Sequence, residues 1–221
     1  MKKISSIIFA LVLFVLTAHG QSADIRKETA PKETTPVVQV PLSYGIVTDN
    51  SGSYRTILEE VINSVKTIVE ANDSDDEAFL VRFVDSNKIT LLQDFSSSKV
   101  ELQSAAEDMF IEGGQTAILD AVHFSAKHLA SNETAGQNKR KLLILITDGE
   151  DRKSATKLDE ALKFLKEEKI QVYTLGFSDG KIYKNLLEKL AKETGGKSFI
   201  AEKRSDIKTA VKQLTTALRS Q

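Results

Sequence analysis

"LSYGIVTDNSGS" at residues 42–53 joins an apolar stretch to a polar turn. The apolar part predicts a buried strand, and Asp49, Ser51 and Ser53 follow where that strand should end. Apolar residues at helical spacing then occupy residues 54–70. The turn that carries one acid and two serines therefore leads from a strand into a helix, the position where open α/β sheets bind their ligands.

The rest of the chain repeats this alternation. Strand patterns recur at 78–84, 88–95, 142–147, 170–177 and 197–201, and helical patterns at 98–111, 116–130, 154–168, 181–194 and 204–219. Only three residues separate the second and third strands, which predicts a hairpin and hence one antiparallel pair. We therefore predict an α/β fold with a doubly wound, mostly parallel, six-stranded sheet, one antiparallel edge strand and helices on both faces.

The N-terminal region has a different composition. Residues 1–20 place Lys2 and Lys3 before an apolar run and finish with small residues, which is typical of a secretory signal peptide cleaved after Gly20. Residues 21–39 are polar, charged and proline-bearing, which indicates a flexible spacer. The folded domain is expected to span 40–221. We expect an exported protein, periplasmic or secreted, with no membrane span after signal cleavage.

Composition narrows the function classes. The chain has no cysteine, which excludes disulfides, thiolate metal sites and cysteine nucleophiles. Without residues 1–20 it carries 28 basic and 31 acidic residues, a net charge of −3. Proteins that bind nucleic acid usually present a basic surface, so this balance does not favour a nucleic-acid partner.

Two further polar residues fall at places comparable to the opening turn. Asp148 directly follows the apolar run "LLILIT", and Thr116 lies in "GGQTA" before a helix. With Asp49, Ser51 and Ser53 they offer two carboxylates and three hydroxyls, which suit Mg²⁺, Mn²⁺ or Ca²⁺ and suit zinc poorly. If a carboxylate acts through water, the cation stays under-neutralised and attracts a carboxylate from outside.

These residues resemble a known family. "DNSGS" is similar to the D-x-S-x-S signature of von Willebrand factor type A (vWA) domains, and Thr116 and Asp148 stand where that family has the other residues of its metal-ion-dependent adhesion site. The resemblance covers about 180 residues, 40–220, and the exported bacterial type is the one it suggests. It implies that Ser51, Ser53 and Thr116 coordinate the metal, with Asp49 and Asp148 acting directly or through water. It also implies a protein partner that completes the coordination with an Asp or Glu carboxylate.

Three residues near the turn are candidates for the ligand face: Tyr54, Gly114 and Glu150. Tyr54 stands where many members carry an aliphatic residue or Met, and it either flanks the ligand or begins the core of the helix, the second reading being favoured. Gly113 and Gly114 allow their loop a close approach. Glu150 and Asp151 are expected to charge the first turn of the next helix, or to repel acidic partners.

Other interpretations stay open. Asp49 and Ser51 could cap a helix, although this would leave Thr116 and Asp148 without a role. Mg²⁺ beside carboxylates also suits hydrolysis or phosphoryl transfer, but no Gly-rich phosphate loop accompanies it. The site could also serve stability alone. Finally, the resemblance implies that Thr116 gains direct contact with the metal when a partner carboxylate binds, while Asp148 retreats behind water. The last helix, 204–219, is held by one apolar face and could shift in response.

Overall fold

The structure is a computed structural model that describes residues 40–132 and 138–220. The predicted signal peptide and spacer lie outside the described residues. The described chain forms a six-stranded sheet of order β3-β2-β1-β4-β5-β6, in which only the β2–β3 pair is antiparallel. The strands are β1 (Leu42–Asp49), β2 (Glu77–Phe83), β3 (Ile89–Ser96), β4 (Arg140–Thr147), β5 (Gln171–Phe177) and β6 (Ser198–Ala201). The predicted fold class is confirmed.

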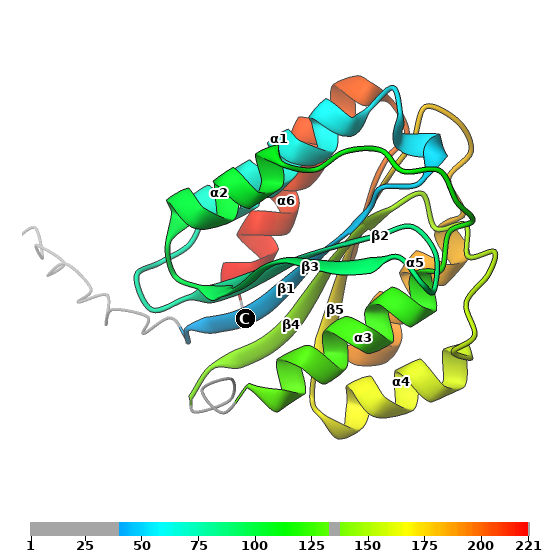
Figure 1. Cartoon of the computed structure of the whole chain (residues 1–221). Helices are drawn as coiled ribbons and strands as arrows, with labels where there is room; N and C mark the ends of the chain where they lie inside the picture. Colours follow the sequence, from blue (N-terminus) through cyan, green and yellow to red (C-terminus); the bar gives the residue numbers. More distant parts are fainter. Residues whose placement is uncertain (1–39, 133–137, 221) are drawn as a thin grey trace, which may run out of the picture. The chain divides into compact units, whose positions relative to one another are not determined.

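Helices cover both faces of the sheet (Figure 1). One apolar cluster joins α1, α2 and α6 to the sheet, and a second joins α3, α4 and α5 to the opposite face. Among the described residues, no helix is long and apolar enough to cross a bilayer. The helices are α1 (Leu58–Glu70), α2 (Lys99–Glu107), α3 (Ile118–Ser131), α4 (Leu158–Glu167), α5 (Lys184–Thr194) and α6 (Ile207–Arg219), with short 3-10 turns η1 (Gly52–Tyr54) and η2 (Arg204–Asp206).

The two central strands determine where the sheet's functional edge lies. All eight residues of β1 are buried, as are the last six of β4, because helices pack on both sides of this part of the sheet. β1 and β4 pair in parallel with Ile46 opposite Ile144 and Thr48 opposite Ile146. Their carboxyl ends therefore reach the same edge, and the residues that follow them lie side by side.

Several helix boundaries differ from prediction. The helix expected from residue 54 begins at Leu58, preceded by the 3-10 turn η1. The helix expected over 98–111 ends at Glu107, and an irregular segment runs from there to Thr116. Both differences lie where the chain turns around the same edge of the sheet. The predicted end of the helix expected over 181–194 is confirmed, because Gly195 has φ 77° and ends α5 in the left-handed conformation.

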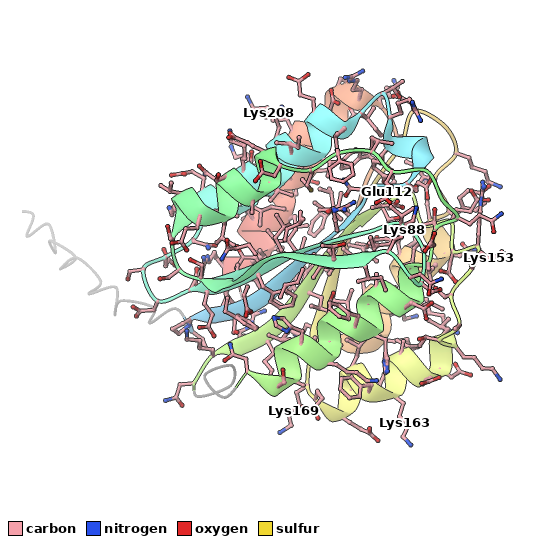
Figure 2. The ribbon with its side chains drawn as sticks, in the orientation of Figure 1. Lys88, Glu112, Lys153, Lys163, Lys169 and Lys208 are labelled. Atoms are coloured by element: carbon pink, nitrogen blue, oxygen red, sulfur yellow. The ribbon has the colours of Figure 1, made fainter. Side chains whose placement is uncertain are left out.

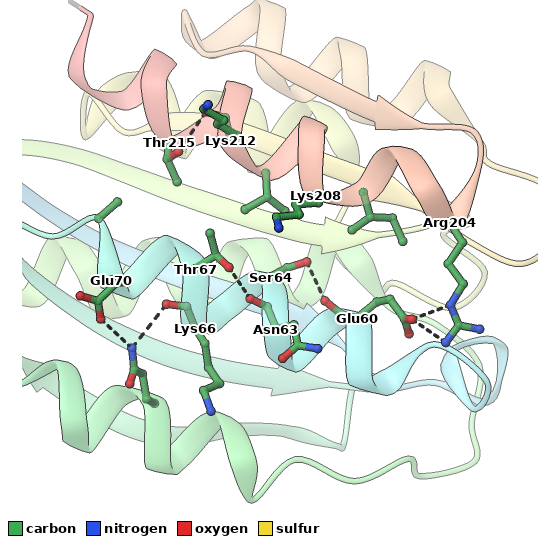
Figure 3. Close-up of a pocket in the computed structure, with 14 residues that line it drawn as sticks. Glu60, Asn63, Ser64, Lys66, Thr67, Glu70, Arg204, Lys208, Lys212 and Thr215 are labelled. Carbon is green, nitrogen blue, oxygen red and sulfur yellow. Dashed lines mark hydrogen bonds and ion pairs between the residues drawn. The ribbon is translucent and has the colours of Figure 1, made fainter.

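Ion pairs hold α6 near both of its ends. Arg204, just before the helix, pairs with Glu60 of α1, and Arg219 pairs with the buried Asp76. Between these ends α1 and α6 border a groove of about 870 Å³, which Lys208, Lys212 and other side chains line (Figure 3). A shift of α6 along this groove would disturb both ion pairs, and the predicted movement stays a prediction.

Close packing in the centre of the sheet yields a stability prediction. A Cβ added to Gly45 of β1 would lie 2.2 Å from Cζ of Phe79, well inside van der Waals contact. We expect Gly45→Ala to lower the free energy of unfolding by about 1–3 kcal/mol through overpacking, measured by urea denaturation. Gly52→Ala is the matched control, because nothing lies within 4 Å of its added Cβ. Equal stabilities for the two variants would contradict the packing.

Candidate metal-binding site

Asp49, the last residue of β1, has a completely buried side chain. Its Oδ1 accepts a hydrogen bond from the Ser51 backbone N–H at 2.9 Å, and its Oδ2 accepts one from the Thr147 hydroxyl at 2.7 Å. Burial raises the pKa of Asp49 to about 6, although these hydrogen bonds oppose the rise. The charge of Asp148 raises this pKa further, so the two acids are close enough to repel one another.

Three of the other predicted site residues surround this carboxylate. The Ser51 and Ser53 hydroxyls are 3.0 Å apart, with Ser51 buried and Ser53 exposed. Asp148 follows β4 and is 5% exposed, and burial raises its pKa while interaction with the Ser53 hydroxyl lowers it. Asp49, Ser51, Ser53 and Asp148 therefore form one connected group of oxygen atoms that reaches the surface at Ser53.

Thr116 approaches this group on a third loop. It is 6% exposed, and its carbonyl oxygen accepts hydrogen bonds from the backbone N–H groups of Arg152 and Lys153 at 2.9 and 3.1 Å. These bonds join the Thr116 loop to the loop that carries Asp148. The contacts described for Thr116 are made by its backbone, so the role of its hydroxyl remains a prediction.

Two residues of this edge were missed by the sequence reasoning. The Thr147 hydroxyl orients the Asp49 carboxylate, and Asn50, between Asp49 and Ser51 in the chain, is completely buried. The Asn50 side-chain amide donates to the Phe110 carbonyl at 3.0 Å, and the backbone carbonyl of Asn50 accepts from the Glu112 N–H at 3.1 Å. Both residues are sequence neighbours of the predicted ligands Asp49 and Asp148, which was the one available indication of a role. The sequence pattern, however, assigns Thr147 to a strand and Asn50 to a turn.

Neither Asp49 nor Ser51 caps α1, and Ser51 occupies only the N-terminal cap position of the short turn η1. The residue at the N-terminal cap of α1 is Ile57, and Ser51 makes no side-chain capping bond to η1. Asp151 also acts differently from prediction, because its Oδ1 accepts from the Ile118 N–H at 2.7 Å. It therefore charges the first turn of α3, while α4 begins only at Leu158.

The three ligand-face candidates have different outcomes. Tyr54 is fully buried and donates to the Phe177 carbonyl at 2.8 Å, so it belongs to the core and not to a ligand face. Gly114 is exposed, and a Cβ there would lie 2.4 Å from Cγ1 of Val84, so the predicted close approach is confirmed for this glycine. A Cβ at Gly113 would meet nothing within 4 Å. Glu150 is partly exposed and pairs with Arg152, which lowers its pKa.

The electrostatics of this edge fit a divalent cation. Asp49 and Asp148 are both buried, both have a raised pKa, and the partners described for Asp49 are neutral donors. The described residues contain no cluster of three or more acidic, histidine or cysteine side chains spaced for a metal ion. The group that the structure brings together holds two carboxylates and two serine hydroxyls, oxygen ligands that Mg²⁺ and Ca²⁺ accept, and the Thr116 hydroxyl remains the predicted fifth ligand. A cation near them would offset the cost of burying two negative charges.

Comparison with known proteins identifies the family. Residues 45–213 match the von Willebrand factor type A domain. The chain belongs to the von Willebrand factor type A family. Domains of this family are generally protein-interaction modules, and many bind a divalent metal ion. The chain is 33% identical over 110 residues to vitrin of Homo sapiens, a match that includes 48% of this chain and 16% of vitrin.

Solved structures share the vWA fold. An aerotolerance-related membrane protein from Bacteroides fragilis superposes with a TM-score of 0.66 at 18% identity, covering 81% of this chain and all of that one. BatB from Bacteroides thetaiotaomicron gives a TM-score of 0.63 at 19% identity with the same coverage. A von Willebrand factor type A protein from Catenulispora acidiphila gives 0.68 at 16% identity, over 81% of this chain and 43% of that one.

The raised pKa of Asp49 predicts a dependence of stability on pH. The folded protein keeps this proton up to about pH 6, whereas the unfolded chain releases it at about pH 4. Between these values the folded state binds more protons, so the contribution of Asp49 to stability falls as pH rises, by about 3 kcal/mol. In chelator, Asp49→Asn should therefore gain stability relative to the wild type by about this amount between pH 4 and pH 7.

Urea denaturation at a series of pH values in EDTA measures this difference. Asp159→Asn is the control, because Asp159 is exposed on α4, and its profile should follow the wild type. If the stability of Asp49→Asn also varies with pH in parallel to that of the wild type, burial does not raise the pKa of Asp49.

Proposed function

We propose that this vWA domain is a divalent-cation-dependent protein-binding module of the cell envelope or the secreted fraction. Asp49, Ser51, Ser53, Thr116 and Asp148 would hold Mg²⁺, or Mn²⁺ or Ca²⁺, at the carboxyl edge of the sheet. A bound cation would supply a coordination position for an Asp or Glu carboxylate of the partner. The chain's own residues position the cation and exclude other side chains from it.

One observation carries this proposal: two buried acids with raised pKa values adjoin a pair of serine hydroxyls that reaches the surface. A site that served the fold alone would be satisfied by partners from within the protein. Here the group opens to solvent at Ser53, and the described partners of Asp49 are neutral. The positive charge that acts on Asp148 is that of Arg152, which is itself paired with Glu150. Such an arrangement favours a cation that is still accessible to a partner.

Metal binding is the direct test. We expect Asp49→Ala and Asp148→Ala each to abolish Mg²⁺ and Mn²⁺ binding in calorimetry, because each variant removes one of the two carboxylates. At 100 times its dissociation constant, Mg²⁺ should add about 2.7 kcal/mol to the stability of the wild type and nothing to either variant. Circular dichroism should remain near that of the wild type.

Asp159→Ala again provides the matched control and should bind Mg²⁺ as the wild type does. If both site variants bind Mg²⁺ with unchanged affinity, the assignment of the site is wrong. If the wild type binds no divalent cation while its spectrum and stability indicate a folded domain, the proposed function fails as a whole.

The competing function is a Mg²⁺-dependent hydrolase or phosphoryl-transfer enzyme that uses the same acids. Asp49 is poorly placed as a nucleophile, because its side chain is fully buried and both oxygens accept hydrogen bonds. We expect no turnover of p-nitrophenyl phosphate or p-nitrophenyl acetate with Mg²⁺ or Mn²⁺. Metal-dependent turnover that disappears in Asp49→Ala would establish the enzyme instead.

A further inference from the structure

Phe110 is exposed beside the candidate metal site. Its side chain is 52% exposed, one of four large hydrophobic side chains exposed in the described part of the chain. The other three are Val40, at the start of the described residues, Val100 on α2 and Phe124 on α3. Phe110 differs from these because it lies in the irregular segment that leads from α2 to Thr116.

Two hydrogen bonds attach this segment to the first metal-site loop. The carbonyl of Phe110 accepts from the Asn50 side chain at 3.0 Å, and the N–H of Glu112 donates to the Asn50 carbonyl at 3.1 Å. Asn50 is fully buried and stands between Asp49 and Ser51 in the chain. The backbone that carries Phe110 is therefore fixed to the loop that presents the predicted metal ligands.

The ring of Phe110 is held in position as well. The guanidinium of Arg82 lies 4.2 Å from the ring centroid, and Arg82 also pairs with Glu112 at 3.0 Å. Glu112 pairs in turn with Lys88, again at 3.0 Å, and the two lie close together (Figure 2). Arg82 is itself mostly buried, so the cation beneath the ring has little freedom to move. These contacts order the exposed ring of Phe110 in the free protein, so a partner that binds it loses little further conformational entropy from this side chain.

We propose that Phe110 determines partner specificity by receiving an aromatic or aliphatic side chain next to the acidic residue bound at the metal site. This inference rests on the proposed function. The partner segment would therefore pair an Asp or Glu with an apolar neighbour. Rigid aromatic side chains that are exposed before binding commonly provide a large share of the binding energy in protein interfaces.

Two blocked pentapeptides test this specificity. In Ac-Gly-Phe-Asp-Phe-Gly-NH2 phenylalanine flanks the acid on both sides, and in Ac-Gly-Gly-Asp-Gly-Gly-NH2 glycine does. We expect the first to bind the wild-type protein about tenfold more tightly in saturating Mg²⁺, measured by NMR titration, because an aromatic contact adds to the carboxylate. Phe110→Ala should bind the two peptides equally and retain wild-type affinity for Mg²⁺.

Val100→Ala is the matched control, because Val100 is 77% exposed but belongs to α2. It should keep the full preference for the phenylalanine peptide. Equal binding of both peptides to the wild type, or an unchanged preference in Phe110→Ala, would overturn the role of Phe110 while leaving the metal site intact. If neither peptide binds although Mg²⁺ does, carboxylate recognition fails and this inference fails with it. If Mg²⁺ itself does not bind, the site assignment is at fault.

Discussion

The hydrogen bond from the Thr147 hydroxyl to Asp49 Oδ2, 2.7 Å long, joins the carboxyl ends of the two central strands. It can form only because β1 and β4 are parallel neighbours whose ends lie in register. With the Ser51 N–H on the other oxygen, it keeps a carboxylate inside the protein at the point where the first loop turns. The positions of the serine pair, of Asn50 and of the segment attached to Asn50 all follow from this arrangement.

The same arrangement explains why this edge should bind a cation. Burial raises the pKa of both acids, and the nearby Asp148 charge raises that of Asp49 further. The vWA domain thus stores an unfavourable interaction that a divalent ion would relieve. Tyr54, just after the serine pair, is fully buried and donates a hydrogen bond to the carbonyl of Phe177 at the end of β5, so it attaches this turn to the core. In the proposed function, the side of the site that opens to solvent at Ser53 is the one that a partner would approach.

Much of this could be predicted from the sequence, for physical reasons. Continuous apolar runs such as that of β4 mark buried parallel strands, and polar residues directly after them must lie at one edge, so Asp49 and Asp148 could be placed in advance. The residue at which α1 begins could not be predicted, because apolar residues at helical spacing continue through η1 and Tyr54 is buried in this turn. Asn50, Thr147 and the capping of α3 by Asp151 depend on contacts between distant loops, which spacing along one chain does not reveal.

We propose that the carboxyl edge of β1 and β4 holds one divalent cation, and the position of this cation can be measured. Crystals of the protein grown with Mn²⁺ and recorded at the manganese absorption edge would give an anomalous difference map. We expect a peak in contact with the Ser51 and Ser53 hydroxyls, between the Asp49 and Asp148 loops and within reach of Thr116. A map with no peak at this edge, at a Mn²⁺ concentration that saturates the protein in solution, would contradict it.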